Sequence, residues 1–241
     1  MLNIDYDFTE LPKRNLDYFI PTNLQPDLNE YNTASTTTVP RITANQGHKK
    51  TGHYGSAGNM AEWTKTLEVC NKFLNPIGLA SQYVTVFVSN KNQTAWNVHK
   101  DGYFTNDDKL NNTISSLEAR ISFYGLSTAP GAIRWWSEDD VKINLEIHRH
   151  SGLVTGPRRA KGNANFVEDL QQGKISWNEI PAPAFSSVTT CPSALVRTNL
   201  AHHVVQGDGF RYVVGFTITF DDGNPVGVWD HIRKNIDRLA V

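Results

Sequence analysis

Short runs of β-branched and aromatic residues recur along the chain after residue 80. Clusters of Gly, Pro, Asn and Asp separate these runs, and this pattern is typical of short strands joined by turns. The runs predict five strands, at 82–88, 119–124, 132–136, 194–198 and 212–220. Several short strands with this spacing favour an antiparallel sandwich or barrel.

The strand predicted at 212–220 has a clear alternation of side chains, because successive residues of a strand point to opposite faces. One face carries Tyr212, Val214, Phe216, Ile218 and Phe220. The other face carries Arg211, Val213, Gly215, Thr217 and Thr219. An arginine that shares a face with small residues leaves room for an anionic group, and a guanidinium binds a carboxylate through a bidentate fork. The alternative is a surface arginine at a strand end.

The flanking segments predict support for this β-rich region. Residues 1–55 lack periodicity and contain four prolines, so they predict an arm wrapped on the surface, with a mobile lid over a site as the alternative. Apolar residues at helical spacing predict a helix over 57–74, within a supporting segment at 57–80. A C-terminal helix is predicted at 228–239.

The length of 241 residues predicts a single domain, 1–241. Its β core is expected at 81–221, interrupted by a long mixed interval at 137–190. Within that interval, 158–161 predicts a loop and 166–172 predicts a short helix.

Composition narrows the class of protein. The 23 basic and 24 acidic residues give a net charge of −1, which disfavours a nucleic-acid partner. No apolar run approaches the roughly 20 residues needed to span a bilayer, and the start of the sequence lacks the pattern of a signal peptide. We therefore expect a cytoplasmic protein without membrane contact. The two cysteines form neither a disulfide framework nor a zinc ribbon, so any metal should be held by some of the eight histidines and by carboxylates.

The triplet His99-Lys-Asp101 is the first candidate for chemistry. On a strand, positions i and i+2 project from one face, so this imidazole and this carboxylate would point the same way. Two neighbouring ligands for one metal ion arise in this way. Alone, the triplet is a weak signal and favours a surface His and Asp near a turn.

The second candidate is a histidine pair followed by a turn and an arginine. His202 and His203 precede Val204, and Arg211 follows His202 by nine residues at the start of the next predicted strand. Together with His99 and Asp101, one of the two histidines makes up a set of two imidazoles and one carboxylate. Such a facial triad leaves three metal positions open and suits non-haem Fe(II).

On these residues the sequence resembles the Fe(II)/2-oxoglutarate-dependent dioxygenases. The spacing of His202, Val204 and Arg211 is similar to that of the prolyl-hydroxylase branch. The resemblance covers 81–221 and implies a mainly β fold, a double-stranded β-helix of jelly-roll, cupin-like type with supporting α-helices. The separation of 103 positions from His99 to His202 then implies an insertion within 137–190.

A further resemblance, to the aspartyl/asparaginyl β-hydroxylase branch, involves Arg120-Ile-Ser122-Phe-Tyr124. It implies that Arg120, Ser122 and Tyr124 reach 2-oxoglutarate from one face of a strand. Arg120 could equally pair with an acid elsewhere in the fold.

The resemblance implies that His99, Asp101 and His202 hold Fe(II), while Arg211 binds the distal carboxylate of 2-oxoglutarate. His203 is the alternative to His202, since only one of two adjacent strand residues can face the metal. With O2, such an enzyme hydroxylates a peptide, an amino acid or another small molecule and releases succinate and CO2. The alternatives are a metal-free jelly-roll module for binding or structure, and a cupin-type metal enzyme that does not use 2-oxoglutarate. The position of Arg211 favours the 2-oxoglutarate-dependent enzyme over the cupin-type metal enzyme.

Overall fold

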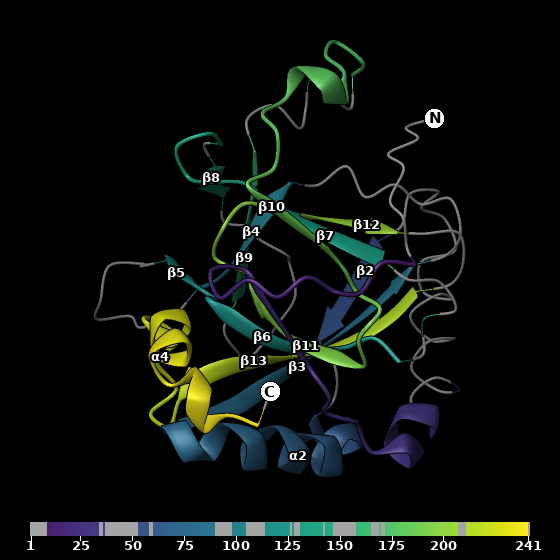
Figure 1. Cartoon of the computed structure of the whole chain (residues 1–241), viewed down its shortest axis with the longest axis vertical. Helices are drawn as coiled ribbons and strands as arrows, with labels where there is room; N and C mark the ends of the chain where they lie inside the picture. Colours follow the sequence, from purple (N-terminus) through teal and green to yellow (C-terminus); the bar gives the residue numbers. More distant parts are fainter. Residues whose placement is uncertain are drawn as a thin grey trace.

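The computed structural model contains two antiparallel β-sheets (Figure 1). It describes the following residues: 9–33, 36, 53–57, 60–89, 98–104, 114–125, 127, 131–141, 143–146, 158–164, 169, 172–206 and 211–240. Every strand pairing in these ranges is antiparallel, so the chain is mainly β, as its strand pattern predicts.

The first sheet takes strands from both ends of the chain. Its order is β1 (Phe19–Thr22), β11 (Ser193–Arg197), β6 (Ala119–Phe123), β13 (Arg211–Phe220), β3 (Leu79–Ser89) and β2 (His53–Ala57). The second sheet has the order β10 (Phe185–Val188), β7 (Gly131–Trp135), β12 (His202–Gln206), β4 (His99–Phe104), β9 (Arg158–Ala164) and β8 (Ile143–Glu146), with β5 (Ile114–Ser116) paired to β4.

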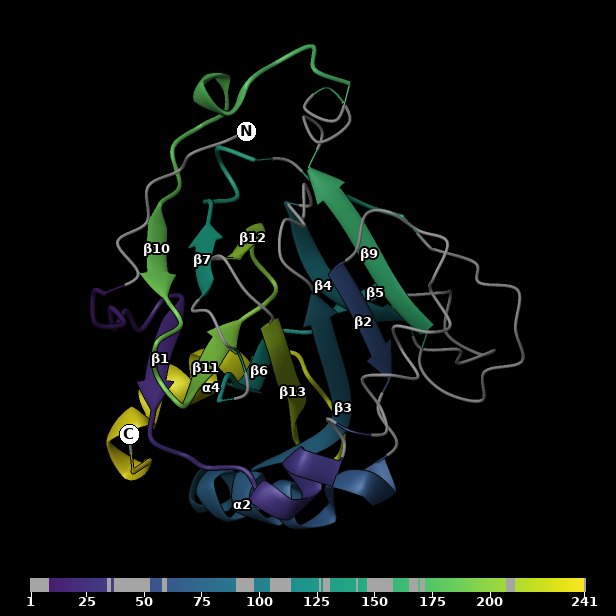
Figure 2. The ribbon, with the colours of Figure 1, turned by 90° about the vertical axis from the view of Figure 1, so that its right-hand side faces the viewer.

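Eight of these strands alternate between the sheets along the chain. The chain passes through β3, β4, β6, β7, β10, β11, β12 and β13 in that order. It changes sheet at every step except from β7 to β10, which pair with each other. Figure 2 shows the resulting stack, with β7, β10 and β12 on one side and β1, β11 and β6 on the other.

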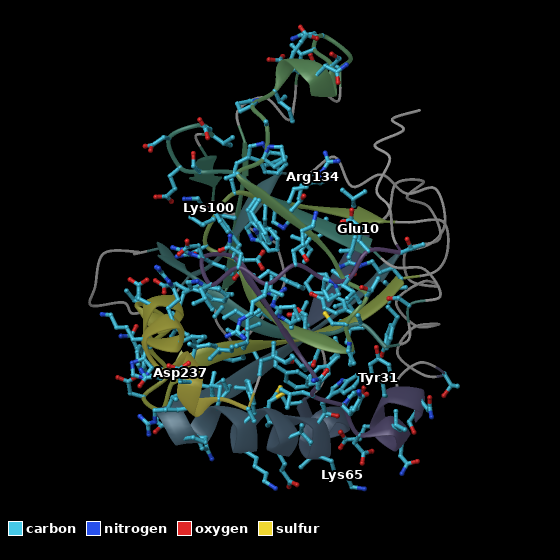
Figure 3. The ribbon with its side chains drawn as sticks, in the orientation of Figure 1. Glu10, Tyr31, Lys65, Lys100, Arg134 and Asp237 are labelled. Atoms are coloured by element: carbon cyan, nitrogen blue, oxygen red, sulfur yellow. The ribbon has the colours of Figure 1, made fainter. Side chains whose placement is uncertain are left out.

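Within the described ranges, the buried apolar side chains form two cores, one on each face of the first sheet. The cluster on the outer face includes Tyr212, Val214 and Phe216 and packs against α2 (Thr64–Leu74) and α4 (Val228–Lys234). The cluster between the sheets includes Val213 and Trp135. The alternation predicted for 212–220 is therefore confirmed. In Figure 3, Lys65 marks α2 on the far side of the first sheet, and Lys100 and Arg134 mark the second sheet.

The predicted helices are shorter than expected. Residue 57 belongs to β2, and a 3₁₀ turn, Met60–Trp63, precedes α2. A second 3₁₀ turn, Asn75–Ile77, follows α2 and ends at Gly78, whose left-handed φ of 71° favours glycine. β3 then begins at Leu79, so the segment 57–80 is only partly helical. Likewise α4 is followed by a separate 3₁₀ turn, Ile236–Arg238. Among the described helices, none combines the length and apolar character needed to cross a membrane.

The segment 1–55, predicted as an arm wrapped on the surface, contains regular secondary structure: residues 28–33 are helical, and β1 and the start of β2 belong to the first sheet. Phe19–Thr22 is the edge strand β1, paired with β11, and Phe19 and Ile20 are fully buried. The strand β2 begins at His53 and pairs with β3. Both pairings join residues that lie far apart in the sequence, which is why local periodicity did not reveal them.

The interval 137–190 is more ordered than its composition predicts. The loop predicted at 158–161 is wrong, because β9 runs through these residues between β4 and β8. The short helix predicted at 166–172 lies mostly outside the described residues. A 3₁₀ turn, Trp177–Glu179, follows it, and this part of the chain projects from the sheets at the top of Figure 1.

Candidate metal centre

Three predicted ligands meet on two neighbouring strands of the second sheet. His99 and Asp101 lie two residues apart on β4, and His202 lies opposite His99 on β12. The potential ligand atoms of the three side chains all lie within 4.8 Å of one another. His99 Nε2 is 3.6 Å from Asp101 Oδ1, and the two imidazole rings are 4.4 Å apart between centroids. Two imidazoles and one carboxylate at this spacing could hold one metal ion.

A backbone contact orients the His202 ring. Its Nδ1 lies 2.9 Å from the carbonyl oxygen of Leu200. A carbonyl oxygen only accepts hydrogen bonds, so Nδ1 is the donor and carries the proton. The neutral ring then has its lone pair on Nε2. This is the usual way in which a protein fixes the tautomer of a metal-binding histidine.

The neighbouring His203 lies on the opposite face of β12. It is buried, and its partner in the strand register is Arg134 on β7. Because side chains alternate along a strand, the register that brings His202 to His99 turns His203 away from Asp101. Of the two histidines that the sequence left open, the structure places His202 in the cluster.

Arg120 lies beside the cluster and contacts its carboxylate. The Arg120 guanidinium is 3.0 Å from Asp101 Oδ2, across the space between the two sheets. Its carbon Cζ lies 5.0 Å from the centre of the Phe87 ring on β3. The sequence allowed this arginine either a role in 2-oxoglutarate binding or an acidic partner, and Asp101 is the acidic partner.

Arg211 is a buried cation. Its residue is 4% exposed, and its Nε makes no hydrogen bond within the described part of the chain. Burial lowers the pKa of Arg211 to about 10, and the nearby Tyr124 phenol counteracts this shift. The guanidinium is therefore still charged at neutral pH. No carboxylate of the described residues forms an ion pair with Arg211, so its burial is costly, and an anionic ligand would remove much of that cost.

The other two side chains predicted to bind 2-oxoglutarate also lie in this region. Ser122 is buried on the inner face of β6, and Tyr124 follows the end of the same strand. Burial raises the pKa of the Tyr124 phenol, while the Arg211 and Arg120 charges and the Ser122 side chain lower it. The Tyr124 hydroxyl thus lies near the Arg211 charge, where it could donate a hydrogen bond to a carboxylate, and the Ser122 hydroxyl lies near Tyr124.

Two glycines decide how closely the arginines approach the sheets. A Cβ on Gly215 would overlap Arg120 Cδ, so Arg120 crosses β13 at this glycine. The space that the sequence predicted beside Arg211 is therefore filled, at Gly215, by another arginine. A Cβ on Gly131 would lie 2.9 Å from the Val205 carbonyl oxygen and 3.6 Å from Arg211 Nε. Gly131 on β7 allows the second sheet to approach Arg211 closely.

Sequence reasoning missed Phe87, Gly131 and the Leu200 carbonyl. Phe87 is the residue for which a signal existed, since it lies within the strand predicted at 82–88 and shares a face with Thr85. The Leu200 contact is made by a backbone atom, which has no sequence signature.

Neither a protein-family model nor a curated protein matches the chain. Three similar solved structures illustrate the range of structural likeness. HygX from Streptomyces hygroscopicus with nickel and 2-oxoglutarate bound is 11% identical, covering 83% of this chain and 80% of HygX, with a TM-score of 0.41. The apo form of HygX is 11% identical, covering 86% and 83%, with a TM-score of 0.43. EvdMO1 is 10% identical, covering 83% of this chain and 46% of EvdMO1, with a TM-score of 0.38.

Proposed function

We propose that this protein is an Fe(II)- and 2-oxoglutarate-dependent oxygenase. One observation carries the proposal: the His99, Asp101 and His202 ligand atoms gather within 4.8 Å in a protein that also buries the Arg211 cation with its Nε unpaired. The first feature suits a metal, and the second suits the carboxylate of a ligand.

The strand order supports a double-stranded β-helix, the jelly-roll and cupin-like architecture. Four of the eight alternating strands lie together as β11-β6-β13-β3, and the other four as β10-β7-β12-β4. Two sheets of four with this alternation form a jelly roll of two Greek keys. Counted along these eight strands, His99 and Asp101 lie on the second, His202 on the seventh and Arg211 at the start of the eighth.

The donor set fits Fe(II). Two imidazoles and one carboxylate form a facial triad, which leaves open positions for a cosubstrate and O2. When bound, iron would supply the oxidative chemistry in which 2-oxoglutarate and O2 give succinate, CO2 and a hydroxylated substrate. His202 would present Nε2, because its Nδ1 proton is held by the Leu200 carbonyl.

The arginine fits the distal carboxylate of 2-oxoglutarate. Arg211 is cationic at neutral pH, and its planar fork can bind two carboxylate oxygens. Tyr124 adds a hydroxyl group near this cation, and Ser122 adds one near Tyr124. The buried Arg211 cation favours a 2-oxoglutarate enzyme over a cupin-type metal enzyme without that cosubstrate. The cluster of three potential ligands favours an enzyme over a metal-free binding module. We further propose that a peptide, an amino acid or another small molecule is hydroxylated.

The test is to measure metal binding, 2-oxoglutarate binding and succinate formation with the full chain. Fe(II), 2-oxoglutarate and O2 should give slow succinate production without added substrate. His99→Ala and Asp101→Ala should abolish both metal binding and turnover. Arg211→Ala should keep metal binding but weaken 2-oxoglutarate binding by about 10–150-fold, the range expected for charged hydrogen bonds. Arg233→Ala, which changes an exposed arginine of α4, is the matched control and should leave 2-oxoglutarate affinity unchanged.

The alternatives give different results in the same experiment. Metal binding without 2-oxoglutarate binding or consumption would support the cupin-type enzyme. Binding of neither would overturn the enzyme hypothesis and support the metal-free module.

A further inference from the structure

We infer that Arg120 is a positioning residue that holds the Asp101 carboxylate so that only one of its oxygens is presented to the metal. This inference rests on the proposed function, because it concerns how the same site is prepared for its metal. It replaces the role in 2-oxoglutarate binding that the sequence resemblance implies for Arg120.

The two carboxylate oxygens of Asp101 have different neighbours. Oδ2 is 3.0 Å from the Arg120 guanidinium, whereas Oδ1 is 3.6 Å from His99 Nε2. The ion pair with Arg120 engages Oδ2 and therefore favours one orientation of the carboxylate. Oδ1 is thereby left as the oxygen that faces the site.

Arg120 is itself held on two sides. Phe87 lies against its guanidinium, with 5.0 Å between Cζ and the ring centre. The absence of a side chain at Gly215 lets the aliphatic part of Arg120 cross β13, and the residue is only 6% exposed. The guanidinium therefore has little freedom to swing away from Asp101 towards another ligand.

This arrangement has a consequence for coordination. A carboxylate free on both oxygens can chelate a metal and occupy two positions. With Oδ2 engaged by Arg120, Asp101 occupies one position, and a facial triad then keeps three positions open. A cosubstrate that binds through two oxygens needs two of them, and O2 needs the third.

The first experiment titrates the full chain with Co(II) and follows its visible absorption, which reports both affinity and coordination geometry. Arg120→Met should weaken Co(II) binding by about 10–100-fold, the usual loss when the hydrogen-bond partner of a metal ligand is removed. It should also change the shape and intensity of the Co(II) spectrum. Arg120→Lys keeps the charge but loses the planar fork, so it should restore affinity in part and the wild-type spectrum incompletely.

A second variant moves Arg120 without removing it. Gly215→Ala places a Cβ where Arg120 Cδ lies, and it should change Co(II) affinity and spectrum in the same direction as Arg120→Met. Gly125→Ala is the matched control, since a Cβ there meets nothing within 4 Å, and it should behave as wild type. Thermal unfolding checks that each variant is folded. If Arg120→Met does not fold, Arg120→Lys and Gly215→Ala decide the question.

The outcomes separate this inference from the proposed function. If the wild type binds no metal, the proposed function is wrong, and the positioning role of Arg120 is wrong with it. If the wild type binds Co(II) and the folded Arg120 and Gly215 variants show unchanged affinity and spectrum, the positioning role is wrong. If those variants lose only 2-oxoglutarate affinity, Arg120 is a cosubstrate anchor instead.

Discussion

Two adjacent histidines on β12 lie in different surroundings. His202 is opposite His99 and has its Nδ1 tied to the Leu200 carbonyl, while His203 lies on the other face beside Arg134. A shift of one residue in the pairing of β12 would exchange these positions, because the side-chain period of a strand is two. The strand register thus determines which imidazole can reach a metal.

Replacing each histidine separately tests this assignment. His202→Ala should lower Co(II) or Fe(II) affinity by more than about 100-fold, since it removes a ligand and not only a partner of a ligand. His203→Ala should bind metal with an affinity close to that of the wild type. Isothermal titration calorimetry on the two folded variants measures the difference. The reverse result, with binding lost only in His203→Ala, would mean that β12 has the other register.

At the scale of single residues, local sequence pattern finds the candidate site residues, but it does not find the contacts that they make across the fold. The triplet at His99 and Asp101, the His202 pair and Arg211 are all found from local pattern. Local pattern does not choose between His202 and His203, because both fit a strand and only pairing with β4 separates them. Local pattern also does not identify Asp101 as the ion-pair partner of Arg120, because Asp101 lies on the other sheet and the contact depends on how the sheets pack.

Helix α2 depends on a distant residue at its first turn. The residue before it, Trp63, makes no side-chain cap, although the first backbone N–H groups of a helix lack partners within it. Glu30 supplies the acceptors: its carboxylate accepts hydrogen bonds from the backbone N–H groups of Lys65 and Thr66, at 2.7 and 2.8 Å, and from the Thr66 hydroxyl. The negative charge also suits the positive end of the helix dipole. The N-terminal segment therefore stabilises the helix that supports the first sheet.

Removing this carboxylate should cost stability without touching the metal site. Glu30→Ala is expected to lower the free energy of unfolding by about 1 kcal/mol, as for the loss of a helix cap. Urea unfolding followed by circular dichroism measures the change. Glu68→Ala, on an exposed turn of the same helix, is the control and should shift the midpoint much less. Equal effects of the two substitutions would contradict the capping role of Glu30.

The elements that the sequence predicted share one property. Each of the five predicted strands is rich in apolar β-formers, and each lies in a buried part of a sheet. Of the described strands that it missed, β1 and β9 lack that property. β1 has four residues, one of them Pro21, and β9 is mostly basic and small residues. Such strands form because a neighbouring edge offers backbone partners, and that information is not local to their sequence.

At the scale of the whole molecule, the described buried residues form two separate apolar cores, and each core contains one cysteine. Cys70 is fully buried in the core between the first sheet and the helices, and Cys191 is 9% exposed in the core between the sheets. Both thiols are free. Burial raises the pKa of each of them from 9.0 to about 12. The two thiols therefore report independently on the two sides of the first sheet.

Thiol reactivity should follow the opening of these cores. At pH 8 a thiol with a pKa near 12 is ionised to a fraction on the order of 10⁻⁴, so neither cysteine should react with a disulfide reagent until its core opens. Single-cysteine variants, Cys70→Ala and Cys191→Ala, should label at equal rates if both cores open only in global unfolding. Faster labelling of Cys191 would show that the two sheets separate before the helices detach from the first sheet.

Because the raised pKa of each cysteine favours the protonated thiol in the folded state, the free energy of unfolding should fall as pH rises from about 9 towards 12. Guanidinium midpoints across that pH range should therefore decrease, and less so in either single-cysteine variant than in the wild type.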